Sequence, residues 1–356
     1  MKRRHGLFFI QNSGMAMGVV AMLLWPAVPA RAQGDKPPAG SGSLSRDVAV
    51  QEDGDPAVIP EPVVQSIRRG QEFLRNECAG RYYFRQTGQV GLGTLALMVD
   101  GSVPGRGPNG KEVALGVDFL LKKAQSTGLI YDDIERGTAP MYNHALATLC
   151  LAEVWGMTGQ PEILPVLKRA VDLIVRCQNG KGGWRYSPTP EDADISVTVM
   201  QVVALRAAQN AGILVPGRTI QDAVRYVKGN ACNEGGFGYS GPSAPLVPRS
   251  AAGVLSLQMC GEYEAKEARQ GILYLQKHSG DFEQGMKHYY YAQYYAMQCM
   301  YQARESKLWN QWYAAQCKGL MARQKPTGSW DQSVVDTSFA ILAMGLPYRY
   351  LPIYQR

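Results

Sequence analysis

The stretch at residues 169–184, RAVDLIVRCQNGKGGW, decides the fold because its pattern returns along the chain. It ends in Gln-x-x-x-Gly-x-Trp at 178–184, and the same Gln-x-x-x-Gly-x-aromatic spacing recurs at 276–282 and 324–330. Residues 119–128 and 223–239 hold looser copies. The aromatic residues of the four clearer copies stand at 184, 237, 282 and 330, so the steps are 53, 45 and 48 residues. Self-similarity at this period indicates an array of supersecondary units.

Each copy contains two helical parts of different character. The first is amphipathic, as in residues 166–174, where apolar residues recur at a spacing of three or four with basic residues between them. The second is small and apolar on every side, as in 196–208, 251–260 and 337–345, and is therefore expected to be buried on every side. Between the two we expect a turn in which glycine takes a positive φ and the aromatic residue packs between neighbours.

Six such pairs of an outer and an inner helix fit in the chain. Outer helices are predicted to begin near Val63, Glu112, Val166, Ile220, Lys266 and Leu308, and inner helices near Gly91, Tyr142, Ile195, Ser250, Tyr289 and Val335. Six units with a largely apolar inner set favour closure over an open solenoid. The prediction is therefore an all-α (α/α)6 toroid, a single barrel of six helical hairpins over residues 63–356.

The N-terminal part predicts export. Residues 1–32 combine a basic start, an apolar run at 15–25 and a small-x-small cleavage site at Ala30-Arg31-Ala32, as in a signal peptide. A retained membrane anchor is the alternative. Residues 33–62 are rich in Pro, Gly, Ser and Asp, which predicts a disordered linker. The toroid is then periplasmic or secreted, with no further run long enough to span a bilayer.

Net charge and cysteine content argue against a nucleic-acid-binding protein and against a disulfide-rich protein. Lys and Arg number 37 and Asp and Glu 30, and the signal holds four basic residues and no acid, so the mature charge is 33 − 30 = +3. Such a small excess argues against a nucleic-acid partner. The 7 cysteines are odd in number and scattered over apolar stretches, which predicts buried thiols rather than a disulfide framework. One or two bridges are the alternative in an oxidising compartment.

The residues around Trp184 resemble the QW motif of squalene–hopene and oxidosqualene cyclases and the prenyltransferase/squalene-oxidase repeat. The likeness extends over residues 63–347. The chain also resembles secreted planctomycete-type repeat proteins, squalene-cyclase-like and without assigned activity, through its segments at 141–144, 182–186, 192–196 and 350–356. The resemblance implies an α/α toroid whose central cavity binds or transforms an apolar, isoprenoid-type molecule.

The catalytic signatures of these families are incomplete here. Class II terpene cyclases protonate an alkene with D-x-D-D, whereas residues 192–195 read Asp-Ala-Asp-Ile, with Ile195 in the place of the last acid. Those cyclases use two barrels, and this chain has room for one. Prenyltransferase β subunits hold zinc with Asp-x-Cys and a later His, whereas residues 248–250 read Pro-Arg-Ser. The resemblance therefore implies neither a metal nor a cofactor, and it leaves open whether the chain is an enzyme.

The architecture predicts where a site lies. If all inner helices run the same way, their N-termini meet at one mouth of the ring, which is the default binding site. The candidate catalytic residues there are Asp192, Asp194, His144 and His288, and the candidate substrate-binding residues are Tyr142, Arg249, Tyr290, Tyr291, Tyr294 and Asp336.

Each candidate also has a structural interpretation. Asp192 and Asp194 either donate a proton, which needs a raised pKa, or cap the inner helix, which lowers it. The two histidines are general bases or hydrogen-bonded core residues. Arg249 binds an anion or pairs with a nearby acid. The tyrosines at 289–295 line the cavity or pack between helices.

Three functions follow from these alternatives: an enzyme or enzyme relative acting on an isoprenoid, a non-catalytic binding or interaction protein, and a carbohydrate-active lyase or glycosidase. A deep aromatic cavity favours the first. A filled ring centre favours the second. A shallow polar cleft with two facing carboxylates favours the third.

Overall fold

A computed structural model of the protein describes residues 59–79, 86–132, 139–282 and 286–355. All of them belong to one compact unit within residues 42–356. The predicted signal peptide at 1–32 and the predicted linker up to residue 58 lie outside the described residues.

The described residues form twelve α-helices joined as six hairpins, and among them β-structure is limited to isolated bridges. The outer helices are α1 (Glu61–Ala79), α3 (Gly110–Lys122), α5 (Ile163–Arg176), α7 (Gly217–Lys228), α9 (Lys266–Lys277) and α11 (Ser306–Arg323). The inner helices are α2 (Thr87–Met98), α4 (Pro140–Thr158), α6 (Ile195–Asn210), α8 (Val247–Met259), α10 (Tyr289–Gln302) and α12 (Val334–Met344). The predicted all-α fold of six hairpins is confirmed.

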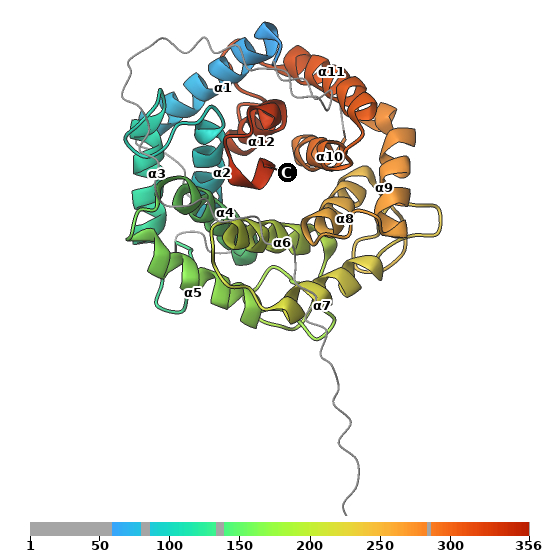
Figure 1. The fold of residues 1–356 in the computed structure, drawn as a ribbon. Helices are drawn as coiled ribbons and strands as arrows, with labels where there is room; N and C mark the ends of the chain where they lie inside the picture. The colour runs from blue at the N-terminus through green and yellow to red at the C-terminus, as the bar shows by residue number, and fades with distance from the viewer. Residues whose placement is uncertain (1–58, 80–85, 133–138, 283–285, 356) are drawn as a thin grey trace, which may run out of the picture. The chain divides into compact units, whose positions relative to one another are not determined.

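The helices of this unit form a closed ring. Each inner helix packs on the next one along the chain, and α12 packs back on α2. The outer helices surround them, with α11 contacting α1 where the two ends of the array meet (Figure 1). Closure, rather than an open solenoid, is therefore the observed arrangement.

The burial of the two helix types matches their sequence patterns. In α5 the apolar residues are buried on one side, from Leu167 to Ile174, while Arg169 is exposed. In α12 every residue from Thr337 to Met344 is buried. Burial of these side chains removes apolar surface from water and is the main term that holds the two layers together.

The turn at residues 178–184 ties its hairpin to the next one. Gly182 has φ 100°, and a Cβ added there would lie 2.0 Å from the carbonyl oxygen of Asp222 in α7. The Nε2 of Gln178 donates to the carbonyl oxygens of Gly182 at 2.9 Å and Thr219 at 2.8 Å. The indole nitrogen of Trp184 donates to the Ile174 carbonyl at 2.7 Å. Glycine is required because any side chain would collide with the neighbouring helix.

The last copy makes the same contacts across the joint of the ring. Gln324 donates to the Ser66 carbonyl at 2.8 Å, and a Cβ on Gly328 would lie 2.3 Å from the Arg69 carbonyl oxygen. Trp330 donates through its indole nitrogen to the Leu320 carbonyl at 2.8 Å. The repeat therefore closes the ring as well as building it.

The copy at 276–282 departs from this pattern. Gly280 lies in the 3-10 turn η2 (Ser279–Asp281), does not have a positive φ and has open space where a Cβ would point. The expected left-handed glycine is therefore wrong for this copy. Phe282 still serves as an anchor, since it is buried with its ring edge-on to Trp312 at 5.5 Å between centroids.

Six of the seven cysteines are buried, Cys78 is partly exposed, and none forms a disulfide. The predicted buried thiols are confirmed. Among the described residues no helix combines the length and apolar character needed to cross a membrane.

Candidate functional site

One position near the start of the inner helices has the same structural task in four repeats. Its side chain accepts a hydrogen bond from the backbone N–H of the residue that anchors the turn. The pairs are Trp184 with Thr198 at 3.2 Å, Phe237 with Ser250 at 3.0 Å, Trp330 with Thr337 at 2.9 Å, and Ile130 with the Nδ1 of His144 at 3.1 Å. His144 is therefore the histidine version of a recurring serine or threonine.

Both ring nitrogens of His144 are engaged. Because Nδ1 accepts from the Ile130 N–H, Nε2 carries the proton and donates to the Ala170 carbonyl at 3.2 Å. Burial lowers the pKa of His144 to about 4. These contacts account for the side chain without a ligand, and its catalytic role stays a prediction.

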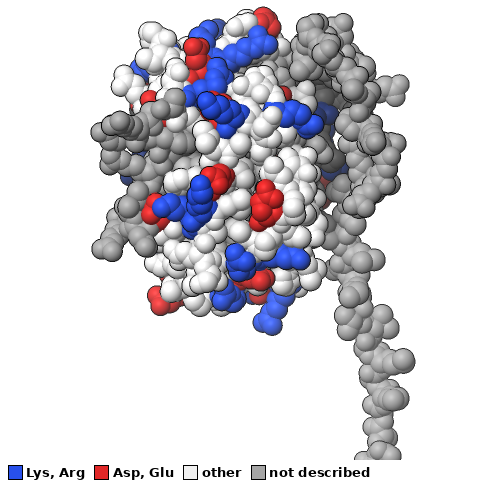
Figure 2. All heavy atoms as spheres, turned by 90° about the vertical axis from the view of Figure 1, so that its left-hand side faces the viewer, with Lys and Arg blue, Asp and Glu red and all other residues white. Residues whose placement is uncertain are grey.

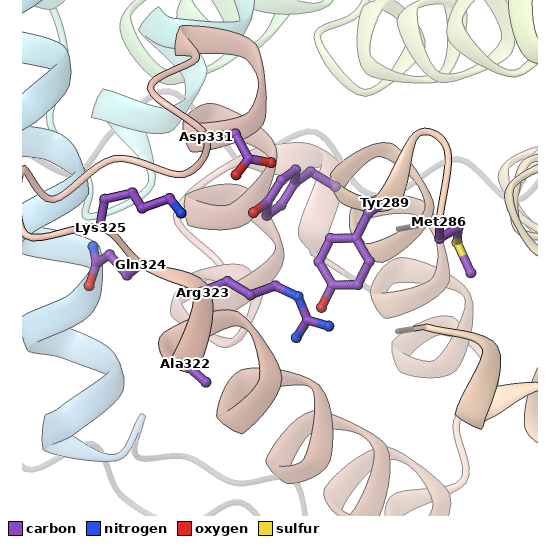
Figure 3. A pocket seen from close by; sticks show the side chains of 8 residues that line it. Met286, Tyr289, Ala322, Arg323, Gln324, Lys325 and Asp331 are labelled. Atoms are coloured by element: carbon purple, nitrogen blue, oxygen red, sulfur yellow. The ribbon is translucent and has the colours of Figure 1, made fainter. Parts of the chain in front are cut away.

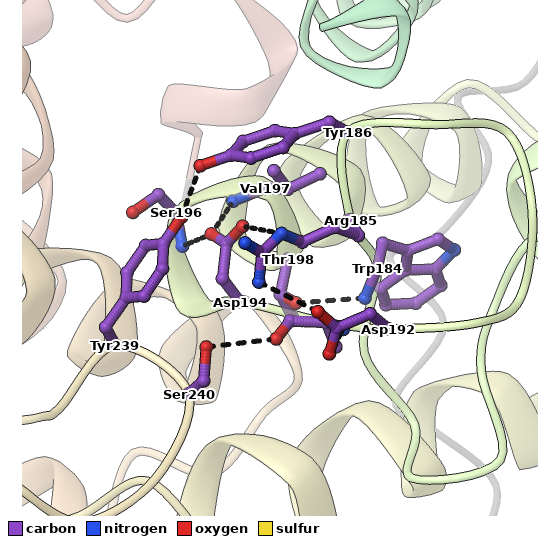
Figure 4. A network of polar contacts seen from close by, with 11 residues as sticks. Trp184, Arg185, Tyr186, Asp192, Asp194, Ser196, Val197, Thr198, Tyr239 and Ser240 are labelled. Carbon is purple, nitrogen blue, oxygen red and sulfur yellow. Dashed lines mark hydrogen bonds and ion pairs between the residues drawn. The ribbon is translucent and has the colours of Figure 1, made fainter.

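Asp194 is the N-cap of α6. Its Oδ1 accepts from the N–H groups of Ser196 at 2.8 Å and Val197 at 3.0 Å, and its Oδ2 lies 3.4 Å from Nε of Arg185 (Figure 4). Burial raises the pKa of Asp194, and the backbone N–H groups and the guanidinium oppose that rise. The capping interpretation is thus confirmed, although the pKa moves opposite to the direction expected for a cap because the carboxyl is buried.

Asp192 shares the same guanidinium from the solvent side. Its Oδ2 lies 3.1 Å from Nη1 of Arg185, its side chain is 68% exposed, and its Oδ1 accepts from the N–H of Ala193. Arg249 donates to the Ala244 carbonyl at 3.0 Å and lies over the ring of Tyr239 at 5.3 Å. The ion pairs to Asp192 and Asp194 that were considered for Arg249 are made instead by Arg185.

Tyrosines surround this ion pair. The hydroxyls of Tyr186 and Tyr239 are hydrogen-bonded to each other, and the Arg185 guanidinium lies 4.8 Å and 5.5 Å from their ring centroids (Figure 4). The ring of Tyr142 lies 5.7 Å from that of Tyr186. Burial raises the pKa of Tyr142, and the Asp194 charge adds to this.

The tyrosines of α10 extend this cluster into the ring. Burial raises the pKa of Tyr291 well above its usual value, with Tyr142 and Asp194 as neighbouring contributors. Its ring lies 4.5 Å from that of Tyr295, and the ring of Tyr294 lies 5.2 Å from that of Phe339. Tyr294 and Tyr295 are buried, so they pack the interior of the ring.

The C-terminal segment occupies the interior as well. The 3-10 turn η4 (Pro352–Tyr354) contacts α4 and α6, and Figure 1 shows the end of the chain inside the ring of inner helices. The N–H of Ile353 donates to Oε2 of Glu153 in α4 at 3.1 Å. Burial raises the pKa of Glu153 to about 8, so this carboxyl is mostly protonated at neutral pH. Tyrosine side chains and η4 therefore fill the centre of the ring.

The remaining candidates lie where α10 and α12 begin. His288 is the N-cap residue of α10 with φ 62°, and burial lowers its pKa while the nearby Asp336 raises it. Burial raises the pKa of Asp336, whose backbone N–H donates to Oγ of Ser333 at 3.2 Å. A cavity of about 380 Å³ opens beside them (Figure 3). Its lining residues are Met286, Tyr289, Tyr290, Ala322, Arg323, Gln324, Lys325 and Asp331.

The structure thus places the predicted residues in two groups at the mouth, with two residues, Tyr294 and His144, outside both groups. Asp192, Asp194, Tyr142 and Tyr291 belong to the Arg185 cluster, with Arg249 stacked at its edge. His288, Tyr290 and Asp336 belong to the α10–α12 side. Tyr294 lies deeper, and His144 points to the turn of its own hairpin.

Sequence reasoning missed Arg185, Tyr186 and Tyr239. A signal for them exists, because they stand one or two residues after the anchors Trp184 and Phe237, where the turn leads towards the mouth. Among the described residues no three His, Cys, Asp or Glu side chains gather in a way suited to a metal ion.

Comparison with known proteins finds solved structures of similar fold. Two of them are variants of the type II terpene cyclase MstE from Scytonema in complex with its substrate, geranylgeranyl dihydroxybenzoate. Each is 14% identical over 82% of this chain, which covers 99% and 98% of the two structures, with a TM-score of 0.34. At this level the likeness does not extend to substrate or activity. No family model and no curated protein matches the chain.

Proposed function

We propose that this chain is an exported, non-catalytic binding protein on a toroid fold, with the mouth of the ring as its binding surface. The observation that carries the proposal is the filled ring centre. Tyr294, Tyr295 and the η4 segment with Tyr354 occupy the volume in which a toroid enzyme would enclose its substrate.

The state of the acid motif supports the same conclusion. Asp194 uses one oxygen to cap α6 and presents the other to Arg185. Burial raises the pKa of this carboxyl overall, but its side chain has no exposed surface and both oxygens face protein groups, whereas a general acid must reach its substrate to protonate it. Both motif acids bind the same guanidinium, so they do not form the separated acid and nucleophile pair of a glycosidase.

A second candidate is an isoprenoid-type ligand held without turnover. The half-buried rings of Tyr142 and Tyr291 favour it, since their faces offer apolar surface at the mouth. The terpene cyclases of similar fold bind such a molecule.

The test is incubation of the purified protein with squalene and with geranylgeranyl dihydroxybenzoate, followed by mass spectrometry of the extract. We expect no cyclised product above the protein-free blank. Product that disappears in a folded Asp194→Asn variant would contradict the proposal. Native mass spectrometry of protein from its own host then asks what it retains: a polyprenoid supports the second candidate, and a protein that retains nothing speaks against binding.

A further inference from the structure

The cavity of about 380 Å³ beside α10 is lined by basic, acidic and phenolic side chains. It lies between the start of α10, the end of α11 and the turn before α12, and Figure 3 shows Arg323, Lys325 and Asp331 around it. Of its lining residues, Gln324 is already engaged, because its side chain bonds Ser66 and the carbonyl of Gly328. The other polar side chains determine which class of ligand the cavity can bind.

Two cations line the side formed by the end of α11 and the turn that follows it. Neither Arg323 nor Lys325 forms an ion pair with an acid of the described residues. Arg323 is half-buried and fixed, since Nη1 donates to the Gly319 carbonyl at 3.0 Å and the guanidinium lies 4.5 Å from the ring centroid of Tyr289. Its remaining N–H groups are donors without an acidic partner in the described part of the chain.

Further donors lie beside these cations. Tyr289 is 8% exposed and lines the cavity, and its hydroxyl makes no well-formed hydrogen bond within the described residues, although Arg323 and Gln293 are near it. The side chain of His288 does not cap α10, so the first N–H groups of this helix receive no side-chain acceptor from it. A helix N-terminus next to two cations favours a negative charge.

The cavity is also lined by an acid, Asp331. Asp331 lies near the hydroxyl of Tyr290, whose pKa is raised chiefly by burial and also by this neighbouring charge. Asp331 and Gln332 have φ 51° and 52°, two consecutive left-handed residues that are not glycine. Such backbone strain persists where the surroundings hold a side chain in place, and it concentrates at functional sites.

From this arrangement we infer that the cavity binds a small molecule carrying an oxyanion, a phosphate or a carboxylate, together with a hydroxyl or ammonium group. The oxyanion lies against Arg323, Lys325 and Tyr289, and the second group donates to Asp331. This inference rests on the proposed function in that it names the ligand class for one part of the mouth.

The test uses two small probes that both carry hydroxyls, glycerol phosphate for the phosphate source and lactate for the carboxylate source, titrated calorimetrically at low salt. We expect saturable binding of at least one of them. An Arg323→Gln/Lys325→Gln variant should bind about tenfold more weakly or worse, because charge-assisted hydrogen bonds are lost. The exposed Lys318→Gln on α11 is the matched control and should bind like the wild type.

The Asp331→Asn variant should change the affinity for inorganic phosphate, which has no hydroxyl-bearing tail, in the direction opposite to the Arg323→Gln/Lys325→Gln variant. Asn tolerates the left-handed backbone, and removal of the acid should strengthen binding of inorganic phosphate while weakening that of glycerol phosphate. The inference is overturned if neither glycerol phosphate nor lactate binds saturably. It is also overturned if Lys325→Gln and the double variant, with unchanged thermal melts, bind the probes as tightly as the wild type does. Turnover of an isoprenoid with intact anion binding would instead overturn only the proposed function.

Discussion

The Nε atom of Arg185 lies 3.4 Å from Oδ2 of Asp194, whose side chain has no exposed surface. A buried carboxylate without a counter-charge is costly, so Asp194 depends on Arg185, whereas Arg185 is partly exposed and also pairs with Asp192. The guanidinium reaches Asp194 from the turn that follows Trp184, which links the repeat anchor to the first turn of α6.

The two acids of the incomplete motif should differ in their contribution to stability. Asp194→Ala removes the acceptor of two backbone N–H groups and leaves Arg185 paired with Asp192 alone, so we expect a loss of ~1–2 kcal/mol or more in the free energy of unfolding. Asp192→Ala removes an exposed ion pair and should cost ~0–1 kcal/mol. Urea denaturation of both variants measures the difference, and equal losses would argue against the cap.

Closure of the ring can be tested at Gly328. Its φ is 86° and a Cβ would lie 2.3 Å from the Arg69 carbonyl oxygen, so Gly328→Ala should lower the free energy of unfolding by ~1–3 kcal/mol. Gly280→Ala is the control, because Gly280 has open space around it and should change stability by only ~0.5 kcal/mol. Thermal melts that rank the two variants the other way would refute this role of the repeat glycine.

Glu153 should make the protein less stable in alkali. Its pKa is raised by burial from 4.5 to about 8, so the folded state favours the protonated form. The resulting stability is complete below pH 4.5 and is lost as the pH rises through 8. Glu153→Gln should flatten this fall and exceed the wild type by ~1 kcal/mol or more at pH 8–9. Unfolding measured from pH 5 to 9 checks it, with the exposed Glu191→Gln as control; parallel curves for Glu153→Gln and wild type would count against it.

His144 should make the protein less stable in acid, whereas Glu153 makes it less stable in alkali. Its pKa is lowered from 6.5 to about 4, so stability is complete above pH 6.5 and is lost as the pH falls through 4. His144→Gln should remove this slope and cost ~1–3 kcal/mol at pH 7, because the bonds to Ile130 and Ala170 are weakened. Denaturation at pH 4 to 7 gives the slope, and the partly exposed His278→Gln should retain it.

The sequence pattern predicted the helices well because the same alternation of an amphipathic and an apolar segment recurs in each repeat. Inner helices were expected near Ile195 and Tyr289, and α6 and α10 begin at those residues. The pattern failed at Gly280, because a matching letter does not show whether a neighbouring helix approaches the backbone.

The site was predicted less completely. The spacing located Asp194 at the start of an inner helix, but the partner of its carboxylate depends on the reach of Arg185 from a turn, which spacing does not give. The segment at 351–354 has no periodicity, and it is buried only because of tertiary contacts with α4 and α6. Its position in the ring therefore had no signal in the sequence.

The bond between Gln324 and Ser66 joins residues 258 positions apart, and it has a consequence for how the molecule is made and changed. An open array can gain or lose a unit at an end, but a closed one has a fixed number of units. The first helix has no complete partner until the last hairpin has been synthesised. The contacts of α1 with α11 and α12 therefore need both ends of the array, and adding or removing one hairpin would break the closure.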